Sequence, residues 1–393
     1  MKKTLIAAAA ASFALAGAAA ADDVKLGVIL GYTGPLESIT PAMAASAELA
    51  MKEVTDAGGI LGGSAVVPVR GDSTCIDAAA ASAAAERLIT SDGVAAIVGA
   101  DCSGVTTAIL QNVAMPNGVV MISPSATSPA LSTIEDNGLF FRTSPSDARQ
   151  GEIVTTILMD KGVKEIAISY TNNDYGKGLA DSIESNFTGA GGKVTINAPH
   201  EDGKADYSAE VGALASAGGE VLVVAGYLDQ GGKGVIQAAL DTGAFDTFYL
   251  PDGMVGESLP AAIGPDLNNS YGALPGTDSE GATKFAEMVE AAGFATGAFT
   301  AESYDAAALV MLAMEAAGST DSAVFKDKVM DVANAPGEQI LPGELAKALE
   351  IIRGGGDVDY VGASAVELVG AGESAGSYRE IEIEDGVKTV GFR

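Results

Sequence analysis

Short apolar runs alternate with amphipathic segments along most of the chain, and this rhythm predicts the secondary structure. Residues 24–30 form an almost continuous apolar run, which is typical of a buried strand. Apolar residues then recur at helical spacing over residues 40–57, and a glycine pair ends the predicted helix. The first part of the chain continues with strands predicted at 66–70, 94–99 and 119–123 and helices at 78–89 and 103–114.

The same rhythm returns after an extended joining segment at residues 141–145. Strands are predicted at 165–170, 193–198, 221–226 and 247–250, and helices at 150–161, 177–190, 206–217 and 233–243. Strand–helix alternation with short apolar strands predicts a parallel sheet that is covered by helices on both faces. The predicted fold class is therefore α/β, with two similar Rossmann-like lobes.

Beyond Tyr271 the order of elements changes. Helices are predicted at 281–292, 302–317, 321–333 and 344–352. The tail, residues 377–392, alternates apolar and polar residues around an Asp-Gly turn, which predicts an antiparallel hairpin. We expect these helices to complete the first lobe and the hairpin to close the second, so that several segments cross between the lobes and form a hinge.

The first 21 residues have the pattern of a secretory signal peptide. Lys2 and Lys3 precede an apolar run over residues 5–15, and a small-residue cleavage signal ends at Ala21. The apolar run is too short to span a bilayer, which needs about 20 apolar residues. Later apolar stretches are short and broken by Gly, Asp or Pro. We expect cleavage after Ala21 and a soluble periplasmic protein without stable membrane insertion.

The net charge of the chain limits the classes of binding partner that can be expected. The chain has 52 acidic and 22 basic residues, a net charge of −30. Phosphate backbones repel such a surface, so nucleic acid is not expected as a partner. No basic amphipathic stretch is available to hold an anionic membrane. The roughly 370 residues after the leader are enough for two domains.

Cys75 and Cys102 are the only cysteines. In an oxidising compartment an isolated pair is most simply one disulfide. A metal site is the alternative, but two thiols and the single histidine, His200, make a poor one. A catalytic thiol would leave the other cysteine unexplained. We therefore expect no metal and no cofactor.

Candidate binding residues follow the strands of the first lobe, because ligands of open α/β sheets bind where strands end. Tyr32 follows the first strand. Ser103 and Gly104 stand where a helix begins, and their N–H groups at its positive end suit a carboxylate. The alternative is that Ser103 is only an N-cap. A further strand is followed by a proline-flanked turn with the residues Ser125, Ala126 and Thr127.

The strand ends of the second lobe carry different chemistry. They offer Tyr175, Tyr227 and Asp252. A carboxylate that faces the anion-binding edge of the first lobe suits a zwitterion, because the helix end holds the ligand's carboxylate and the acid holds its ammonium. The tyrosines would then wall the alkyl part. The alternative for Asp252 is a plain turn residue in Pro-Asp-Gly.

These motifs resemble, in order, the periplasmic leucine/isoleucine/valine-binding proteins, which are type I periplasmic binding proteins. In the first half the resemblance is carried by VKLGVILGYTGP, DSTC, IVGADCSGVTTA and SPSATSP. Further on it is carried by NDYGKGLA, AGYLDQGG, the PDG turn and GAFTAESYDAA. It covers nearly the whole chain after the leader.

The resemblance implies two lobes joined by three crossovers, with a ligand trapped between them by hinge closure. We expect the first lobe to comprise residues 22–142 and 275–360, and the second 143–274 and 361–393. The resemblance implies a disulfide between Cys75 and Cys102. It also implies an ABC permease and its ATPase subunits as partners.

Residue by residue, the resemblance implies that Ser103, Ser125 and Thr127 grip the ligand's carboxylate and ammonium. It makes Tyr175 and Tyr227 cleft tyrosines and Phe299 a side-chain pocket residue. The chain departs from the pattern at Asp252, where family members specific for aliphatic amino acids often have Glu. Asp is one methylene shorter, which leaves the ligand's side chain open.

An enzyme is not expected, since the sequence contains no GxSxG, GxxxxGK[ST] or HExxH motif. His200 stands in a polar segment and is expected to be solvated. The expected function is capture of a small amino acid, branched-chain or otherwise aliphatic, by a monomer that delivers it to an importer. A short amide, a urea-like molecule or a small carboxylate is the alternative ligand, and a periplasmic sensor that acts on a membrane partner is the alternative role.

Overall fold

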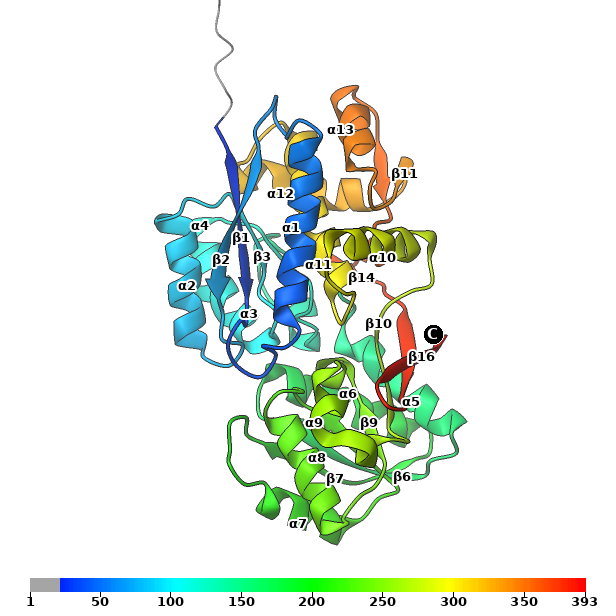
Figure 1. Ribbon diagram of the computed structural model, residues 1–393. Coiled ribbons are helices and arrows are strands. Elements are labelled where there is room, and N and C mark those ends of the chain that lie inside the picture. Colours follow the sequence, from blue (N-terminus) through cyan, green and yellow to red (C-terminus); the bar gives the residue numbers. More distant parts are fainter. Residues whose placement is uncertain (1–21) are drawn as a thin grey trace, which may run out of the picture.

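The structure is a computed structural model that describes residues 22–393, and the predicted signal peptide lies outside the described residues. The described chain forms two bodies, one above the other in Figure 1. We call the upper body, with the first of the two large sheets, the first lobe and the lower body the second lobe.

The first lobe is built on a seven-stranded sheet of order β13-β14-β5-β4-β3-β1-β2. Its strands are β1 (Val24–Leu30), β2 (Val66–Asp72), β3 (Ala96–Gly99), β4 (Met121–Ser123), β5 (Phe140–Arg142), β13 (Leu368–Val369) and β14 (Glu373–Ser374). Neighbouring strands are parallel except for β13 and β14. The strands β3, β4 and β5 are buried along their whole length, as expected of a sheet that helices cover on both faces.

The second lobe has a seven-stranded sheet of order β16-β15-β10-β9-β8-β6-β7. Its strands are β6 (Glu165–Thr171), β7 (Lys193–His200), β8 (Val221–Ala225), β9 (Phe248–Leu250), β10 (Tyr271–Pro275), β15 (Tyr378–Ile383) and β16 (Val387–Phe392). The strands β6 to β10 are parallel, and β15 and β16 add an antiparallel hairpin to β10. The predicted hairpin and its place in the second lobe are thus confirmed.

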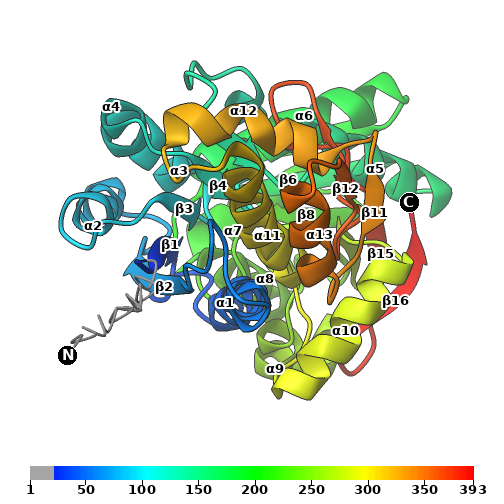
Figure 2. The same cartoon turned by 90° about the horizontal axis from the view of Figure 1, so that it is seen from above.

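The helices of the first lobe come from both ends of the chain. They are α1 (Thr40–Asp56), α2 (Ala78–Thr90), α3 (Ser103–Ile109), α4 (Met115–Asn117), α10 (Glu280–Ala292), α11 (Thr300–Ala317), α12 (Ser322–Ala333) and α13 (Leu345–Arg353). A π-helical turn at Leu110–Ala114 joins α3 to α4. From above, α1, α11 and α13 are neighbours (Figure 2), and α11 is buried from Thr300 to Met314 apart from Ala301. A small parallel pair, β11 (Glu338–Ile340) and β12 (Val358–Tyr360), completes this lobe.

The helices of the second lobe alternate with its strands. They are α5 (Asp147–Asp160), α6 (Asp174–Gly189), α7 (Ser208–Ala217), α8 (Gly231–Thr242) and α9 (Ser258–Ile263). Three of them begin before the predicted first residue, at Asp147, Asp174 and Gly231. Ser146 caps α5 and Asn173 caps α6 by accepting hydrogen bonds from N–H groups of the first turn. These first turns carry two residues of the site described below.

Two expectations need correction. Residues 361–393 were all assigned to the second lobe, but β13 and β14 belong to the first sheet, because β14 pairs in parallel with β5. Strands of two residues carry no periodic pattern that could have indicated this. His200 is buried at the end of β7 rather than solvated, with its Nδ1 2.8 Å from the Ser169 hydroxyl.

The Cys75–Cys102 disulfide is confirmed, with the two Cα atoms 5.2 Å apart. It ties the segment after β2 to the start of α3. In residues 22–393 no helix alone is long and apolar enough to cross a membrane, and α11 and α12 pass that test only as a pair bent by 113°.

Candidate functional site

A small cavity lies between the lobes, where strands of both sheets end. It is lined by Leu36, Asp101, Cys102, Ser103, Ser125, Tyr175, Tyr227, Asp252, Gly253 and Phe299. Its free volume is about 20 Å³, which is little more than the space of one water molecule. The lobes are therefore closed on each other in this structure, and six of the ten predicted binding residues meet at the closure.

The other four predicted residues lie around this cavity. Gly104 lines the adjoining groove beside the disulfide. Ala126 and Thr127 are buried and do not belong to the lining of the closed cavity. Tyr32 is held on the first sheet, since its hydroxyl is 3.4 Å from the Val28 carbonyl and its ring packs against a guanidinium. These contacts keep Tyr32 out of the cavity lining.

The first-lobe wall is built around the start of α3. The first backbone hydrogen bond of this helix runs from Thr106 N to Cys102 O, so the N–H groups of the preceding turn have no acceptor within the helix. Ser103 does not cap its own helix, because its hydroxyl accepts from Ser128 N at 3.1 Å. Ser125 donates to the Asp101 carbonyl at 3.0 Å. This edge of the cavity thus offers hydrogen-bond donors to a ligand.

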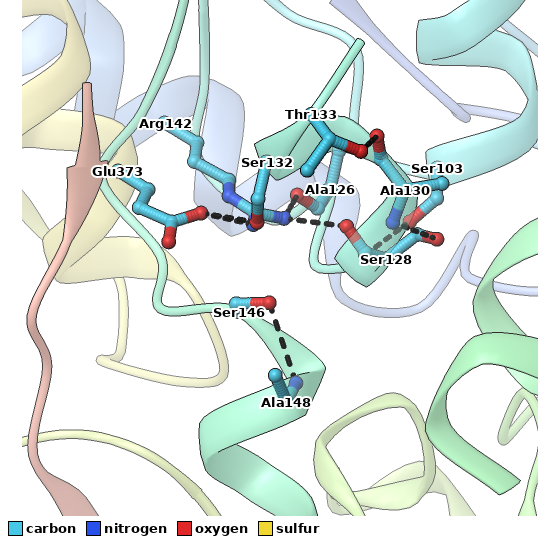
Figure 3. Close-up of polar contacts among 10 residues, drawn as sticks. All are labelled: Ser103, Ala126, Ser128, Ala130, Ser132, Thr133, Arg142, Ser146, Ala148 and Glu373. Carbon is cyan, nitrogen blue, oxygen red and sulfur yellow. Dashed lines mark hydrogen bonds and ion pairs between the residues drawn. The ribbon is translucent and has the colours of Figure 1, made fainter. Parts of the chain in front are cut away.

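Arg142, at the end of β5, holds the loop that carries Ser125 and Thr127 (Figure 3). Its guanidinium donates to the carbonyls of Ala126 at 3.0 Å and Ser128 at 2.9 Å, and it forms a salt bridge with Glu373 of β14. It also donates to the hydroxyl of Ser132 at 2.7 Å. Arg142 is 1% exposed, which makes these bonds effective. Sequence reasoning missed this residue, whose only signal is a charge that ends a short apolar run.

The second-lobe wall combines two tyrosines with a carboxylate. The rings of Tyr175 and Tyr227 are stacked, with centroids 5.2 Å apart. The Tyr175 hydroxyl donates to Asp252 Oδ1 at 2.6 Å, and the Gly253 N–H donates to the same oxygen at 2.7 Å. Asp252 Oδ2 is buried and has no partner among the described residues. This oxygen is available to a donor from outside the chain.

A second carboxylate, which sequence reasoning missed, stands beside the first. Asp147 begins α5 and is fully buried, and neither of its carboxylate oxygens has a hydrogen-bond partner in residues 22–393. The Gln150 amide and the Thr127 hydroxyl are also unpartnered there. Ser146, which caps α5 at Ala148 N (Figure 3), is the signal that could have identified this helix start.

Burial determines the electrostatics of this pair. Burial raises the pKa of Asp147 well above its usual range, the charge of Asp252 raises it further, and Arg142 opposes the shift. Burial also raises the pKa of Asp252, against the hydrogen bonds from Tyr175 and Gly253. Both carboxylate oxygens of Asp147 and Oδ2 of Asp252 lack a donor among the described residues, and they favour a ligand that brings N–H groups, above all an ammonium.

Two further contacts complete the site. Phe299 lines the cavity just before α11, and its backbone has a left-handed φ of 59°, which is unusual for a bulky residue and often marks a functional position. At the rim, Asp229 joins the lobes, since its carboxylate accepts from Ser38 N at 2.9 Å and from the Ser258 hydroxyl at 2.8 Å. Ser38 belongs to the first lobe and Ser258 to the second, so this carboxylate holds the closed arrangement.

Comparison with known proteins agrees with this architecture. A family model described as periplasmic binding protein matches residues 23–339. The Leu/Ile/Val-binding protein homolog 1 of Brucella suis biovar 1 (strain 1330) is 33% identical over 329 residues, which are 82% of this chain and 86% of that protein. A leucine-binding protein of Thermotoga maritima has a similar fold, with a TM-score of 0.79 at 23% identity over 94% of this chain and 98% of its own. So has a solute-binding protein of R. palustris in complex with benzoate, with a TM-score of 0.75 at 18% identity over 94% and 96% of the two chains.

Proposed function

The chain belongs to the periplasmic binding protein family, and we propose that it is the solute-binding component of an ABC importer that captures a small aliphatic amino acid between its lobes. The observation that supports this proposal is that the two walls of the cavity differ in their polar groups. Hydrogen-bond donors at the start of α3 stand on one side of the cavity, and on the other side Asp252 lines it with a carboxylate whose Oδ2 has no partner among the described residues. A zwitterion matches both sides at once.

Each part of the ligand has a proposed place. The ligand's carboxylate binds at the start of α3, between Ser103 and Ser125, where the helix dipole favours negative charge. Its ammonium donates to Asp252 and to the Thr127 hydroxyl. Its side chain lies against Tyr175, Tyr227 and Phe299, which line the cavity. We propose that the ten residues predicted from the sequence bind the ligand, together with Asp147.

Binding requires opening and closing of the lobes, because the cavity as it stands is too small for an amino acid. We propose that the ligand enters an open cleft and that closure adds the second-lobe contacts, with Asp229 joining the rims. The first lobe then comprises 22–142, 275–360 and the strands β13 and β14, and the remainder belongs to the second. The closed monomer presents both lobes to a permease and its ATPase subunits in the periplasm, and it catalyses no reaction.

Substitution of Asp252 by Asn tests this proposal. The variant loses the charge partner of the ammonium, so amino-acid affinity is expected to fall by about 1.5–3 kcal/mol. Isothermal titration calorimetry with leucine, isoleucine and valine measures the change. Asp246→Asn, at an exposed carboxylate on the segment before β9, is the matched control. Equal affinities in both variants would refute the ammonium contact.

One observation favours a second ligand class. Asp147, Asp252 and Gln150 together offer several acceptors, which also suit the NH₂ groups of a short amide or a urea-like molecule. Ser103→Ala separates the two classes, since it weakens a ligand that has a carboxylate and spares a neutral one. A thermal-shift screen over amino acids, amides and carboxylates detects binding of either ligand class, because a ligand that binds only the folded protein raises the protein's stability.

A further inference from the structure

A second and larger cavity lies at the hinge and shares no lining residue with the cleft cavity. Its walls come from β10, β15 and β16 of the second lobe and from α10 and the start of α11 of the first. Figures 1 and 2 both show α10 and β16 on the same side of the molecule. The free volume is about 190 Å³. A cavity of about 150 Å³ is enough to hold a benzene molecule, so this one has room for a small organic ligand.

Arg379 of β15 lines this cavity and differs from every other arginine of the chain. The other six each form a salt bridge with a carboxylate, namely Arg70, Arg87, Arg142, Arg149, Arg353 and Arg393. Within residues 22–393 the guanidinium of Arg379 has neither a salt bridge nor a hydrogen bond, although it is half-buried. In a chain with 52 acidic residues, a guanidinium without a partner that lines a cavity is positioned for an external carboxylate.

Glu302 lines the same cavity and supplies a second polar group. It is 3% exposed, and it forms no salt bridge with Arg379. Burial raises the pKa of Glu302 to about 8, although the charge of Arg379 opposes the shift, so its carboxyl can hold a proton near neutral pH and donate a hydrogen bond. A ligand carboxylate would therefore meet two donors, the fork of Arg379 and the carboxyl of Glu302.

Apolar side chains form much of the remaining wall, among them Ala282, Phe285 and Phe392. Strand pairing places Phe392 opposite Arg379, and both residues line the cavity. The cavity therefore combines one cationic end with an apolar body. A ligand with several negative charges fits poorly, because a single guanidinium would have to balance them in a chain of net charge −30.

We propose that the hinge cavity is a second binding site, for a small monocarboxylate whose carboxylate pairs with Arg379 and whose short apolar body lies against Phe285 and Phe392. The chemistry of this site does not depend on which ligand the cleft binds. Since both lobes contribute walls to it, an occupant fixes the lobes relative to each other and so couples to opening of the cleft.

Binding of sodium butyrate to the protein without its leader tests this site, with the neutral butyramide as the matched ligand. Calorimetry and thermal shift are expected to show binding of butyrate only, and about tenfold or greater weakening in Arg379→Gln. Arg149→Gln, which removes an exposed salt bridge, is expected to bind butyrate like the wild type. Ser103→Ala is expected to retain butyrate binding as well, because that serine belongs to the cleft.

Ala282→Leu fills the cavity without a change of charge and is expected to abolish binding, which keeps the test valid if Arg379→Gln does not fold. No binding of butyrate to the wild type would overturn the proposal. So would binding that Ser103→Ala abolishes and Arg379→Gln retains, since butyrate would then occupy the cleft.

Discussion

The two lobes differ in how completely their buried polar groups are hydrogen-bonded. In the first lobe, Asp305 accepts from the Tyr360 hydroxyl and from the backbone and side chain of Ser364. Asp101 accepts from Gly31 N and the Ser73 hydroxyl. In the described part of the second lobe, buried side-chain atoms lack partners in Asp147, Gln150, His200, Tyr249, Asp252 and Tyr378.

This difference indicates that the two lobes have different roles in ligand binding. A buried polar atom without a partner costs stability, so it persists where function uses it. Among the described residues, the buried side-chain atoms of the first lobe that lack a partner are only the hydroxyls of Thr106 and Thr127, so this lobe can serve as a rigid platform. The second lobe keeps acceptors free at the cleft, and closure on a ligand with N–H donors would satisfy them.

Substitution of Arg142 by Met is expected to have the largest effect on stability, because it removes hydrogen bonds to buried groups of the first lobe. The carbonyls of Ala126 and Ser128 and the carboxylate of Glu373 lose the hydrogen bonds that the guanidinium donates. We expect a loss of roughly 3–5 kcal/mol in the free energy of unfolding, as for other broken buried pairs. Urea denaturation measures it, with Arg149→Met at an exposed salt bridge as the control. Equal losses in the two variants would contradict the proposed clamp.

The second-largest effect is expected from His200 of the second lobe, whose burial makes the free energy of unfolding depend on pH. Burial lowers the pKa of His200 to about 4, below the 6.5 of the unfolded chain. Above pH 6.5 His200 is neutral in both states, whereas between pH 6.5 and 4 the unfolded state binds more protons, so stability is lost as the pH falls from 6.5 to 4. The full loss is about 3 kcal/mol at 1.36 kcal/mol per pKa unit.

Proton NMR can follow this directly, since His200 is the only histidine. His200→Asn has no imidazole and so lacks this pH-dependent part of the stability. The stability advantage of the wild type over this variant should therefore shrink as the pH falls from 6.5 to 4. An imidazole that titrates near 6.5 in the folded protein would show that His200 is not desolvated.

Asp147→Asn sharpens the comparison at the cleft. The change removes a buried charge beside Asp252, so we expect the ligand-free protein to gain about 1 kcal/mol of stability while affinity for an ammonium ligand falls. Thermal unfolding and calorimetry on one preparation measure the two effects. Asp246→Asn is again the control. A stability loss without any change in affinity would make Asp147 a purely structural residue.

The smallest effect is expected at the rim. Asp229→Asn weakens the contacts that join Ser38 to the second lobe and should reduce ligand affinity by about 1 kcal/mol, or roughly fivefold. Calorimetry measures the affinity, and small-angle X-ray scattering reports a more open average shape. Asp241→Asn, which alters an exposed pair with Gln237 on α8, should do neither. An Asp229 variant that behaves like this control would exclude a role in closure.

Long periodic segments were predictable, and short or capped ones were not. The predicted helix at 40–57 is α1, and the hairpin predicted at 377–392 contains β15 and β16. The start of α5 was missed because its first turn is polar and is defined by a cap rather than by apolar period. Asp147 was missed with it. The strands β13 and β14 were missed because two residues show no period.

The sequence by itself determined the α/β rhythm through periodicity, the disulfide through its single pair of cysteines, and five of the six predicted residues that meet in the cavity through the rule of strand ends, whereas Phe299 followed from the family resemblance. Only the tertiary structure decided which buried groups are left without partners. Arg142 reaches Glu373 from 231 positions away, and Arg379 of β15 lines a cavity with Glu302 of α11. Such pairings depend on how distant segments pack, and no local pattern of residues encodes them.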